Sequence, residues 1–308
     1  MSGALAQRPA AVALAGALAR RPAAAAVAGA LTIAFSSILV RLADVSPEAA
    51  AFFRCAYALP LLGWLAWRED RRHGRRSARD RWLAVPAGVF FAGDLIFWHH
   101  AIGDVGAGLA TVLGNLQVLV VPVAAWAVLS EAIERRILVA LPLVCSGVVL
   151  ISGVLEAHAY GRDPARGVLF DALTGLNYAA FILVLRHGSS DLRRPAGPLF
   201  DTTAVSAVTC LVVALALGVD LVPSWPAHGW LALLALSSQV LGWLLITVSL
   251  PRLPAAITSV TLTIQPIGAL ILAALLLGEE PSVLQLAGAA CILGGLVSVA
   301  LGGRRARA

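Results

Sequence analysis

The chain has 308 residues, of which 59% are hydrophobic and only 13% are charged. Ordinary globular domains carry about 25% charged residues, and the mean hydropathy here is +0.86. A soluble protein of this size could not bury so much apolar surface, so composition predicts an integral membrane protein. It excludes disordered, collagen-like and disulfide-rich secreted classes.

All 23 basic residues are arginine and 17 residues are acidic, which gives a net charge of +6. A basic soluble chain would suggest nucleic-acid binding, but these arginines stand in short connections between apolar runs, where they report orientation in the bilayer. We therefore expect no nucleic-acid partner. The four cysteines lie inside apolar segments without metal-ligand spacing, so they are interpreted as small core residues, and no metal or cofactor is predicted.

Ten stretches of the chain are long and apolar enough to be spanning helices, which need about 20 residues each. In chain order they are 24–42, 48–67, 82–102, 106–129, 137–155, 167–185, 198–219, 229–250, 254–277 and 282–301. None shows the period-2 alternation of a membrane β-barrel. The sequence therefore predicts an all-α integral membrane protein with ten transmembrane helices and no separate soluble domain.

The arginines also predict which way the chain crosses the bilayer. With the amino terminus in the cytoplasm, 19 of them fall inside, Arg54 lies within a span, and only Arg41, Arg162 and Arg166 fall outside. The positive-inside rule then places both termini in the cytoplasm of a cell membrane. A short apolar run near the amino terminus could pass for a signal peptide, but the first span follows at once, so residues 1–23 and 303–308 are expected to be cytoplasmic tails.

An internal repeat is the most informative feature. Residues 107–131 align without a gap on residues 255–279, so that Gln117 falls on Gln265 and Glu131 on Glu279. Five spans separate the copies, an odd number, so the copies must face opposite ways, with Glu131 inside and Glu279 outside. Many secondary transporters are built from such inverted repeats, with the substrate path near the bilayer midplane.

Several motifs support the same division of the chain. The first half contains SPEAAAFFR around Arg54, and DLIFWHHAI followed by GAGLATVLGNLQV; the second contains GLNYAAFILVLR around Asn177 and LLLGEE at Glu279. With ten spans in two halves, this pattern resembles the EamA domain of the drug/metabolite transporter superfamily, present twice. The resemblance implies two inverted five-helix repeats, 24–155 and 167–302, in a carrier of small metabolites. Such carriers are commonly exporters of amino acids or related compounds and lack an ATPase part.

Two ionisable residues lie at matching depth within predicted spans, Arg54 about 9 Å and Asp94 about 12 Å from the outer end. Charged groups at such depth are costly unless they are paired or hydrated, and they mark functional candidates. We expect them to form an ion pair or to face a common aqueous cavity. Asp94 could then carry a coupling proton, or Arg54 could hold a substrate carboxylate. The alternative is a permanent bridge that only fixes two helices.

Uncharged polar residues and aromatic residues gather near the same depth. The amides could line a substrate pocket or join helices, and the aromatic rings could form its flat walls or face lipid. These candidates are Asn115, Gln117, Asn177, Gln239 and Gln265, together with Trp98, Tyr178 and Trp243.

The adjacent histidines His99 and His100 point about 100° apart on a helix, so they cannot chelate one metal ion together. One of them, with His99 the candidate, could face the cavity mouth and respond to pH, or both could simply reach water at the interface. Asp171 and Asp201 lie near the ends of predicted spans and are expected to be hydrated.

Other function classes fit less well. A membrane-embedded enzyme would need a nucleophile with its base, an HExxH motif, a Walker loop or a GxSxG elbow, and the sequence has none. A channel would need rings of charge or a filter. We therefore predict a secondary active transporter rather than an enzyme or scaffold, with a small molecule and the lipid bilayer as partners. Its substrate is expected to be an amino acid or related compound, with another small metabolite or a lipid-like molecule as the alternative.

Overall fold

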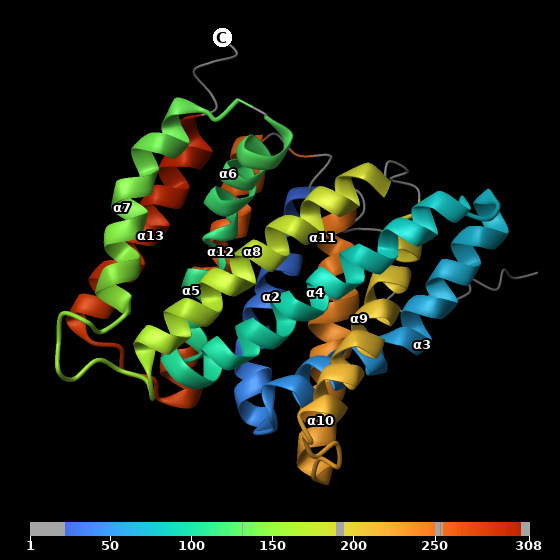
Figure 1. The fold of residues 1–308 in the computed structure, drawn as a ribbon, viewed down its shortest axis with the longest axis horizontal. Coiled ribbons are helices and arrows are strands. Elements are labelled where there is room, and N and C mark those ends of the chain that lie inside the picture. The colour runs from blue at the N-terminus through green and yellow to red at the C-terminus, as the bar shows by residue number, and fades with distance from the viewer. Residues whose placement is uncertain (1–21, 131, 189–193, 250–252, 254, 303–308) are drawn as a thin grey trace, which may run out of the picture.

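The computed structural model describes residues 22–130, 132–188, 194–249, 253 and 255–302. The predicted tails, apart from Pro22 and Ala23, and Glu131 lie outside these residues. All regular structure within the described residues is helical (Figure 1). The elements are α2 (Pro22–Ala43), α3 (Pro47–His73), α4 (Ala78–Val105), α5 (Ala107–Gly114), α6 (Gln117–Leu129), α7 (Arg135–Ile151), α8 (Pro164–Gly188), α9 (Ala196–Ala216), α10 (Trp225–Leu234), the π-helix η1 (Ala235–Gly242), α11 (Trp243–Ser249), α12 (Ala255–Leu277) and α13 (Val283–Gly302).

The predicted apolar runs coincide with these helices, and local sequence sets several of the ends. At the start of α3, the Ser46 hydroxyl accepts a hydrogen bond from the Ala49 amide, and Pro47 occupies the first turn, where its missing N–H costs nothing. Gly106, with φ of 94°, separates α4 from α5 in a conformation that favours glycine. The fourth predicted span is thus divided into α5 and α6, and the eighth into α10, η1 and α11.

Within the described residues, seven helical stretches are long and apolar enough to cross a membrane. They are Pro22–Ala43, Pro47–His73, Ala78–Val105, Ala107–Val128, Pro164–Val184, Ala196–Ala216 and Trp225–Ser249. Thr263–Leu277 and Val283–Val299 are shorter apolar helices, and α7 has 17 residues. The chain is therefore a multi-pass membrane protein, while the full number of ten spans stays a prediction.

The exposed surface is as apolar as a lipid-facing surface should be. Large aliphatic side chains such as Val139, Val212 and Leu275 are exposed by 77%, 59% and 76%. In water such a surface would promote association, whereas in a bilayer it is the favourable one.

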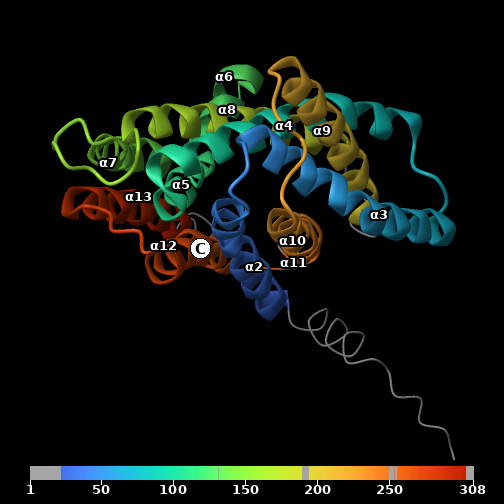
Figure 2. The ribbon, with the colours of Figure 1, turned by 90° about the horizontal axis from the view of Figure 1, so that it is seen from below.

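The two halves of the chain, α2–α7 and α8–α13, contact each other reciprocally. The first helix of each half packs on the third and fourth spans of the other: α2 on α10–α11 and α12, and α8 on α4 and α5–α6. The second helices, α3 and α9, pack together, and so do the last, α7 and α13 (Figures 1 and 2). This arrangement places the inner helices of both halves around one central region.

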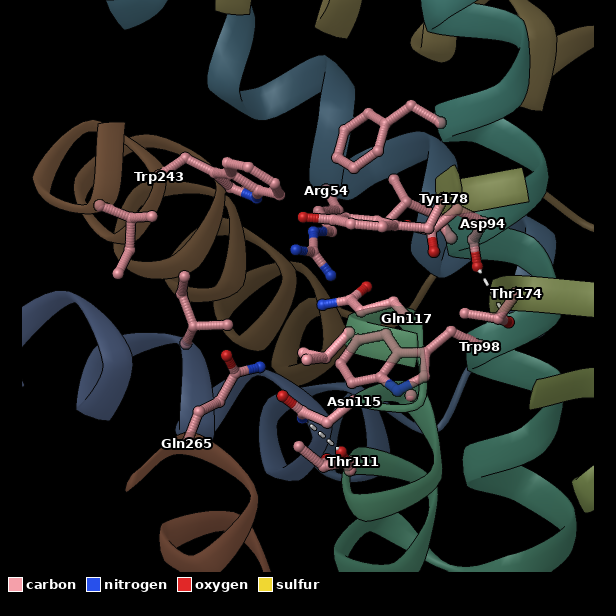
Figure 3. Close-up of a pocket in the computed structure, with 16 residues that line it drawn as sticks. Arg54, Asp94, Trp98, Thr111, Asn115, Gln117, Thr174, Tyr178, Trp243 and Gln265 are labelled. Atoms are coloured by element: carbon pink, nitrogen blue, oxygen red, sulfur yellow. Dashed lines mark hydrogen bonds between the residues drawn. The ribbon is translucent and has the colours of Figure 1, made fainter. Parts of the chain in front are cut away.

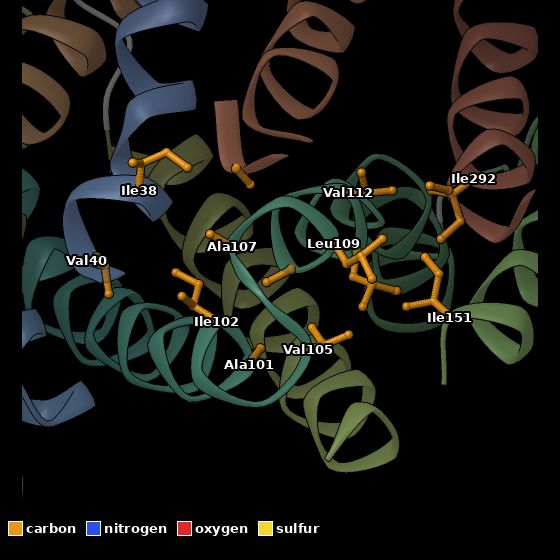
Figure 4. Packing of buried hydrophobic residues seen from close by; sticks show 14 of the residues in the cluster. Ile38, Val40, Ala101, Ile102, Val105, Ala107, Leu109, Val112, Ile151 and Ile292 are labelled. Carbon is orange, nitrogen blue, oxygen red and sulfur yellow. The ribbon is translucent and has the colours of Figure 1, made fainter. Parts of the chain in front are cut away.

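Buried apolar residues from both halves join at the core. Ile38, Val105, Leu109, Ile151 and Ile292 belong to one cluster that connects α2, α4, α5, α7 and α13 (Figure 4).

Glycine lets two backbones meet at the contact between α7 and α13. A Cβ on Gly147 would lie 2.6 Å from the Gly288 carbonyl oxygen, and a Cβ on Gly288 would lie 2.6 Å from that of Gly147. Only glycine fits at either position without moving the helices apart.

Candidate functional site

A cavity of about 160 Å³ lies where α2, α3, α4, α8, α11 and α12 surround the junction of α5 and α6 (Figure 3). Eight of the eleven residues predicted from the sequence line it. They are Arg54, Asp94, Trp98, Asn115, Gln117, Tyr178, Trp243 and Gln265. Both members of the repeat-related pair Gln117 and Gln265 are among them, so the two repeats contribute equivalent side chains to one cavity.

Arg54 is held in place by neutral partners. It is 3% exposed, its Nε donates to Gln239 Oε1 at 3.0 Å, and its Nη1 donates to Ser36 Oγ at 3.2 Å. Its guanidinium carbon lies 5.7 Å from the centre of the Trp98 ring. These contacts fix the guanidinium group at the cavity without neutralising its charge.

Gln239 does not line the cavity, but its hydrogen bond positions Arg54. Its side chain is fully buried within η1, and its Nε2 donates to Thr203 Oγ1 at 3.1 Å. A π-helix widens the helical turn and is frequently found at functional sites. Here the wide turn lies where α10–α11 meets α3, and Gln239 joins Arg54 to α9.

Asp94 faces the same cavity from α4 and is 8% exposed. Among the described residues, no ion pair within 4.0 Å joins it to Arg54 or to another basic group. The predicted direct ion pair is therefore wrong, whereas the alternative prediction, a cavity common to both residues, describes their placement. The two opposite charges face one space without contacting each other.

The amide of Asn115 shapes the break between α5 and α6. Its Nδ2 donates to the Thr111 carbonyl at 2.7 Å, while the backbone amides of Asn115 and Leu116 bond to carbonyls three residues earlier. Asparagine readily forms such local bonds in competition with a continuous helix. The chain therefore tightens at this point and presents Gly114, Asn115 and Gln117 to the cavity.

Besides Gln239, two further predicted residues do not reach the cavity. His99 is 2% exposed, and its Nδ1 lies 3.1 Å from the Pro47 carbonyl oxygen, so it joins α4 to the start of α3 rather than facing a cavity mouth. Asn177 donates to the Leu173 carbonyl at 2.9 Å, and its Oδ1 packs against Gly93, where a Cβ would lie only 2.4 Å away. It serves the contact between α8 and α4.

The structure also corrects the expectation that Asp171 and Asp201 are hydrated. Asp171 is 1% exposed within α8, and Asp201, with a side chain 12% exposed, forms an ion pair with Arg76 at 2.8 Å. Sequence reasoning also missed Thr174, which lines the cavity. Asp171, Thr174 and Tyr178 are spaced as residues on one helix face, and this spacing is the signal that could have grouped them.

The arrangement suits reversible binding of a small polar molecule. A buried arginine, a buried aspartate, three amides and four aromatic rings converge on one space. Within the described residues, no group of three or more His, Cys, Asp or Glu side chains could hold a metal ion.

Comparison with known proteins gives the family. The model of the EamA-like transporter family matches residues 21–153 and again residues 165–301. The chain belongs to the EamA-like transporter family. The resemblance seen in the motifs is thereby confirmed, and the protein is a membrane transporter of small substrates built from two EamA repeats.

The solved structures show that the fold is shared. A structure titled "Crystal structure of protein" is similar over 93% of this chain and 99% of that one, with a TM-score of 0.59 and 14% sequence identity. In all, 24 solved chains match. No curated protein matches the sequence.

Proposed function

We propose that this EamA-family protein is a secondary active transporter that exports a small zwitterionic metabolite, an amino acid or a related compound. It works in the cytoplasmic membrane by alternating access, with both termini in the cytoplasm. The residues in contact with substrate are those of the cavity, and Arg54 and Asp94 are the two that recognise its charges. Gln239 acts indirectly by holding Arg54.

The observation that carries this proposal is the pair of separate charges in the cavity. A guanidinium group has five N–H donors, and only two bonds to neutral partners are formed at Arg54 within the described residues. An uncompensated buried charge is costly, and a carboxylate ligand would satisfy the remaining donors in the bidentate geometry that arginine favours. Asp94 offers the complementary partner for an ammonium group. A zwitterion neutralises both.

The size of the cavity supports a small substrate. Its volume is about 160 Å³. Sites for drug-sized ligands enclose about 300 to 1,000 Å³. A lipid-like or drug-sized substrate would therefore require a much larger opening than an amino acid would.

The repeats support alternating access. The equivalent glutamines Gln117 and Gln265 line the cavity from opposite repeats, and the helix contacts between the halves are reciprocal. In inverted-repeat transporters, one half rocks against the other around a fixed central site. The arginine distribution supports cytoplasmic termini in the same scheme.

Counterflow in liposomes tests the substrate. Purified protein is reconstituted with a panel of labelled amino acids and nucleobases. We expect exchange of small amino acids and a loss of about tenfold or more in Arg54→Gln, because a hydrogen bond to a charged group contributes about 1.5 to 3 kcal/mol. Arg79→Gln, which removes an exposed arginine far from the cavity, is the matched control and should exchange normally.

Two results would contradict the proposal. Exchange of nucleobases without exchange of amino acids would contradict the proposal that the substrate is a zwitterion. Unchanged amino-acid exchange in Arg54→Gln would show that the cavity residue does not bind the carboxylate.

A further inference from the structure

Asp171 is a buried acid whose carboxyl group has no hydrogen-bond partner among the described residues. It is 1% exposed, and neither of its carboxylate oxygens has a hydrogen-bond partner in the part of the chain that the structure describes. The other fully buried aspartate, Asp104, differs, because Arg162 and Arg166 donate to it at 2.6 to 3.2 Å. Burial of an ionised carboxylate without hydrogen bonds or a counter-charge is so unfavourable that such a group takes its neutral form.

Asp94 is a second acid in this buried region. It lies on α4 and Asp171 on α8, the two helices that pack along each other most extensively. Asp94 lines the cavity together with Arg54, whereas Asp171 does not line it. Two carboxyl groups in one low-dielectric region do not both ionise, so the acid that shares the cavity with the arginine holds the negative charge and the other keeps a proton.

Other titratable groups lie on α8 and on the helices packed against it. From α4, His99 lies 3.1 Å from the Pro47 carbonyl oxygen, His100 bonds to Glu48 at 2.8 Å, and Asp104 pairs with the arginines of the following loop and helix. The sequences of α5 and α6 contain no titratable side chain. On α7, these groups are Arg135 and Arg136 in its first turn and the exposed Cys145, and on α8 itself Tyr178 faces the cavity.

Gly114 lies next to both the cavity and Asp171. Gly114 lines the cavity, and a Cβ built on it would lie 3.4 Å from Trp98 Nε1 and 3.7 Å from Asp171 Oδ1. Both distances are ordinary van der Waals contacts, so alanine fits at this position. Its methyl group would contact both the indole of Trp98 and the Asp171 carboxyl group. The native glycine leaves that approach open.

We propose that Asp171 is a proton-binding site of this transporter and that its proton reaches the cavity past Gly114. The inference deepens the proposed function and rests on it for the coupling step alone. When the ammonium group of a substrate binds at Asp94, positive charge enters beside Asp171 and favours its ionised form. The O–H bond of Asp171 then breaks, and the proton leaves through the cavity to water. When the substrate departs, Asp171 takes up a proton again, so substrate and proton exchange for each other.

Infrared spectroscopy of the purified protein tests the site without any substrate. The carbonyl stretch of a protonated carboxylic acid is recorded in lipid nanodiscs while pH is varied. We expect such a band in the wild-type protein and its loss in Asp171→Asn. Asp201→Asn, which removes a partly buried aspartate paired with Arg76, is the control and should keep the band. Gly114→Ala should keep the band and slow its exchange with deuterium.

The same measurement can overturn the assignment. A band that persists in Asp171→Asn, or one that disappears in Asp94→Asn alone, would place the proton on another residue. Deuterium exchange at an unchanged rate in Gly114→Ala would contradict the path past Gly114.

Transport in liposomes tests the coupling. Counterflow needs no net proton movement, whereas uptake driven by a pH gradient does. In Asp171→Asn, we expect the ratio of gradient-driven uptake to counterflow to fall at least about fivefold, the lower range of typical coupling between sites. An equal fall in both activities would show a structural role and overturn the coupling. If the wild-type protein transported no amino acid, the proposed function would fail, while the infrared result would still decide on Asp171.

Discussion

At the scale of single residues, the cavity depends on a charge that is fixed by neutral groups. Gln239 and Ser36 accept hydrogen bonds from Arg54 without cancelling its charge, and Trp98 lies beside the guanidinium group. A carboxylate in their place would orient Arg54 equally well but would compete with an anionic ligand. The choice of neutral partners therefore keeps the arginine available for binding.

Replacing Gln239 should lower the free energy of unfolding more than replacing Thr203, to which Gln239 donates a hydrogen bond. Gln239→Leu leaves the buried Nε of Arg54 without an acceptor, and we expect a loss of about 1.5 to 3 kcal/mol in the free energy of unfolding. Thr203→Val removes only the neutral bond to Gln239 and should cost about 0.5 to 1.5 kcal/mol. Unfolding in mixed micelles measures both variants.

A larger loss in Thr203→Val than in Gln239→Leu would show that the link to α9, rather than the orientation of Arg54, is the stabilising contact. The same two variants can be compared in counterflow, where Gln239→Leu should raise the KM for substrate more.

At the scale of elements, carboxylates cap helices across the boundary between the halves. The Glu279 side chain, after α12, accepts hydrogen bonds from the amides of Ala107 at 2.7 Å and Gly108 at 3.0 Å at the start of α5. Glu69, in α3, accepts them from Ala196 and Gly197 at the start of α9. A carboxylate satisfies unpaired N–H groups there and complements the helix dipole.

The capping role of Glu279 can be tested by comparison with the adjacent Glu280. Glu279→Ala should lower the free energy of unfolding by about 1 to 2 kcal/mol, because α5 loses its capping carboxylate. Glu280→Ala removes the adjacent, exposed glutamate and should leave stability unchanged. Thermal unfolding in detergent compares the two, and equal effects would mean that general acidity of the turn, and not the cap, is what matters.

The sequence could predict how deep a residue lies in the membrane, but not which side of its helix faces the cavity. Hydropathy located the helices, and depth brought together Arg54, Asp94 and the amides that line the cavity. However, adjacent residues on a helix diverge by about 100°, so Trp98 and Tyr178 reach the cavity while their neighbours His99 and Asn177 cannot. Only the packing of α4 against α8 decides which of each pair points inward.

Asp171 shows a second limit of the sequence. The predicted span began at residue 167, which left Asp171 near its end, whereas α8 begins at Pro164 and packs against α4. The residue is then about 10 Å along the helix, two turns from its start. A shift of a few residues in a helix boundary changed a hydrated acid into a buried one.

At the scale of the whole molecule, the orientation of the two repeats stays a prediction that labelling can check. Single cysteines at position 131 and at the exposed position 280, in a background without native cysteines, should react from opposite sides of the membrane, because five spans separate the equivalent turns. A membrane-impermeant maleimide should label position 280 in intact cells and position 131 only after permeabilisation. Labelling of both from one side would rule out inverted repeats.

The contact of Gly147 with Gly288 has a consequence for how such a chain could arise. Each glycine admits the carbonyl oxygen of the other. The repeat equates Gly147 with Gly295 and Gly288 with Ala140, and these two positions also meet, since a Cβ on Gly295 would lie 3.7 Å from the Ala140 carbonyl oxygen. The terminal helices of the two units therefore present matching surfaces. A surface that fits its own counterpart works equally well between two separate polypeptides. A single unit of five helices, made alone, would already carry half of a symmetric dimer interface, and fusion of two copies would preserve it.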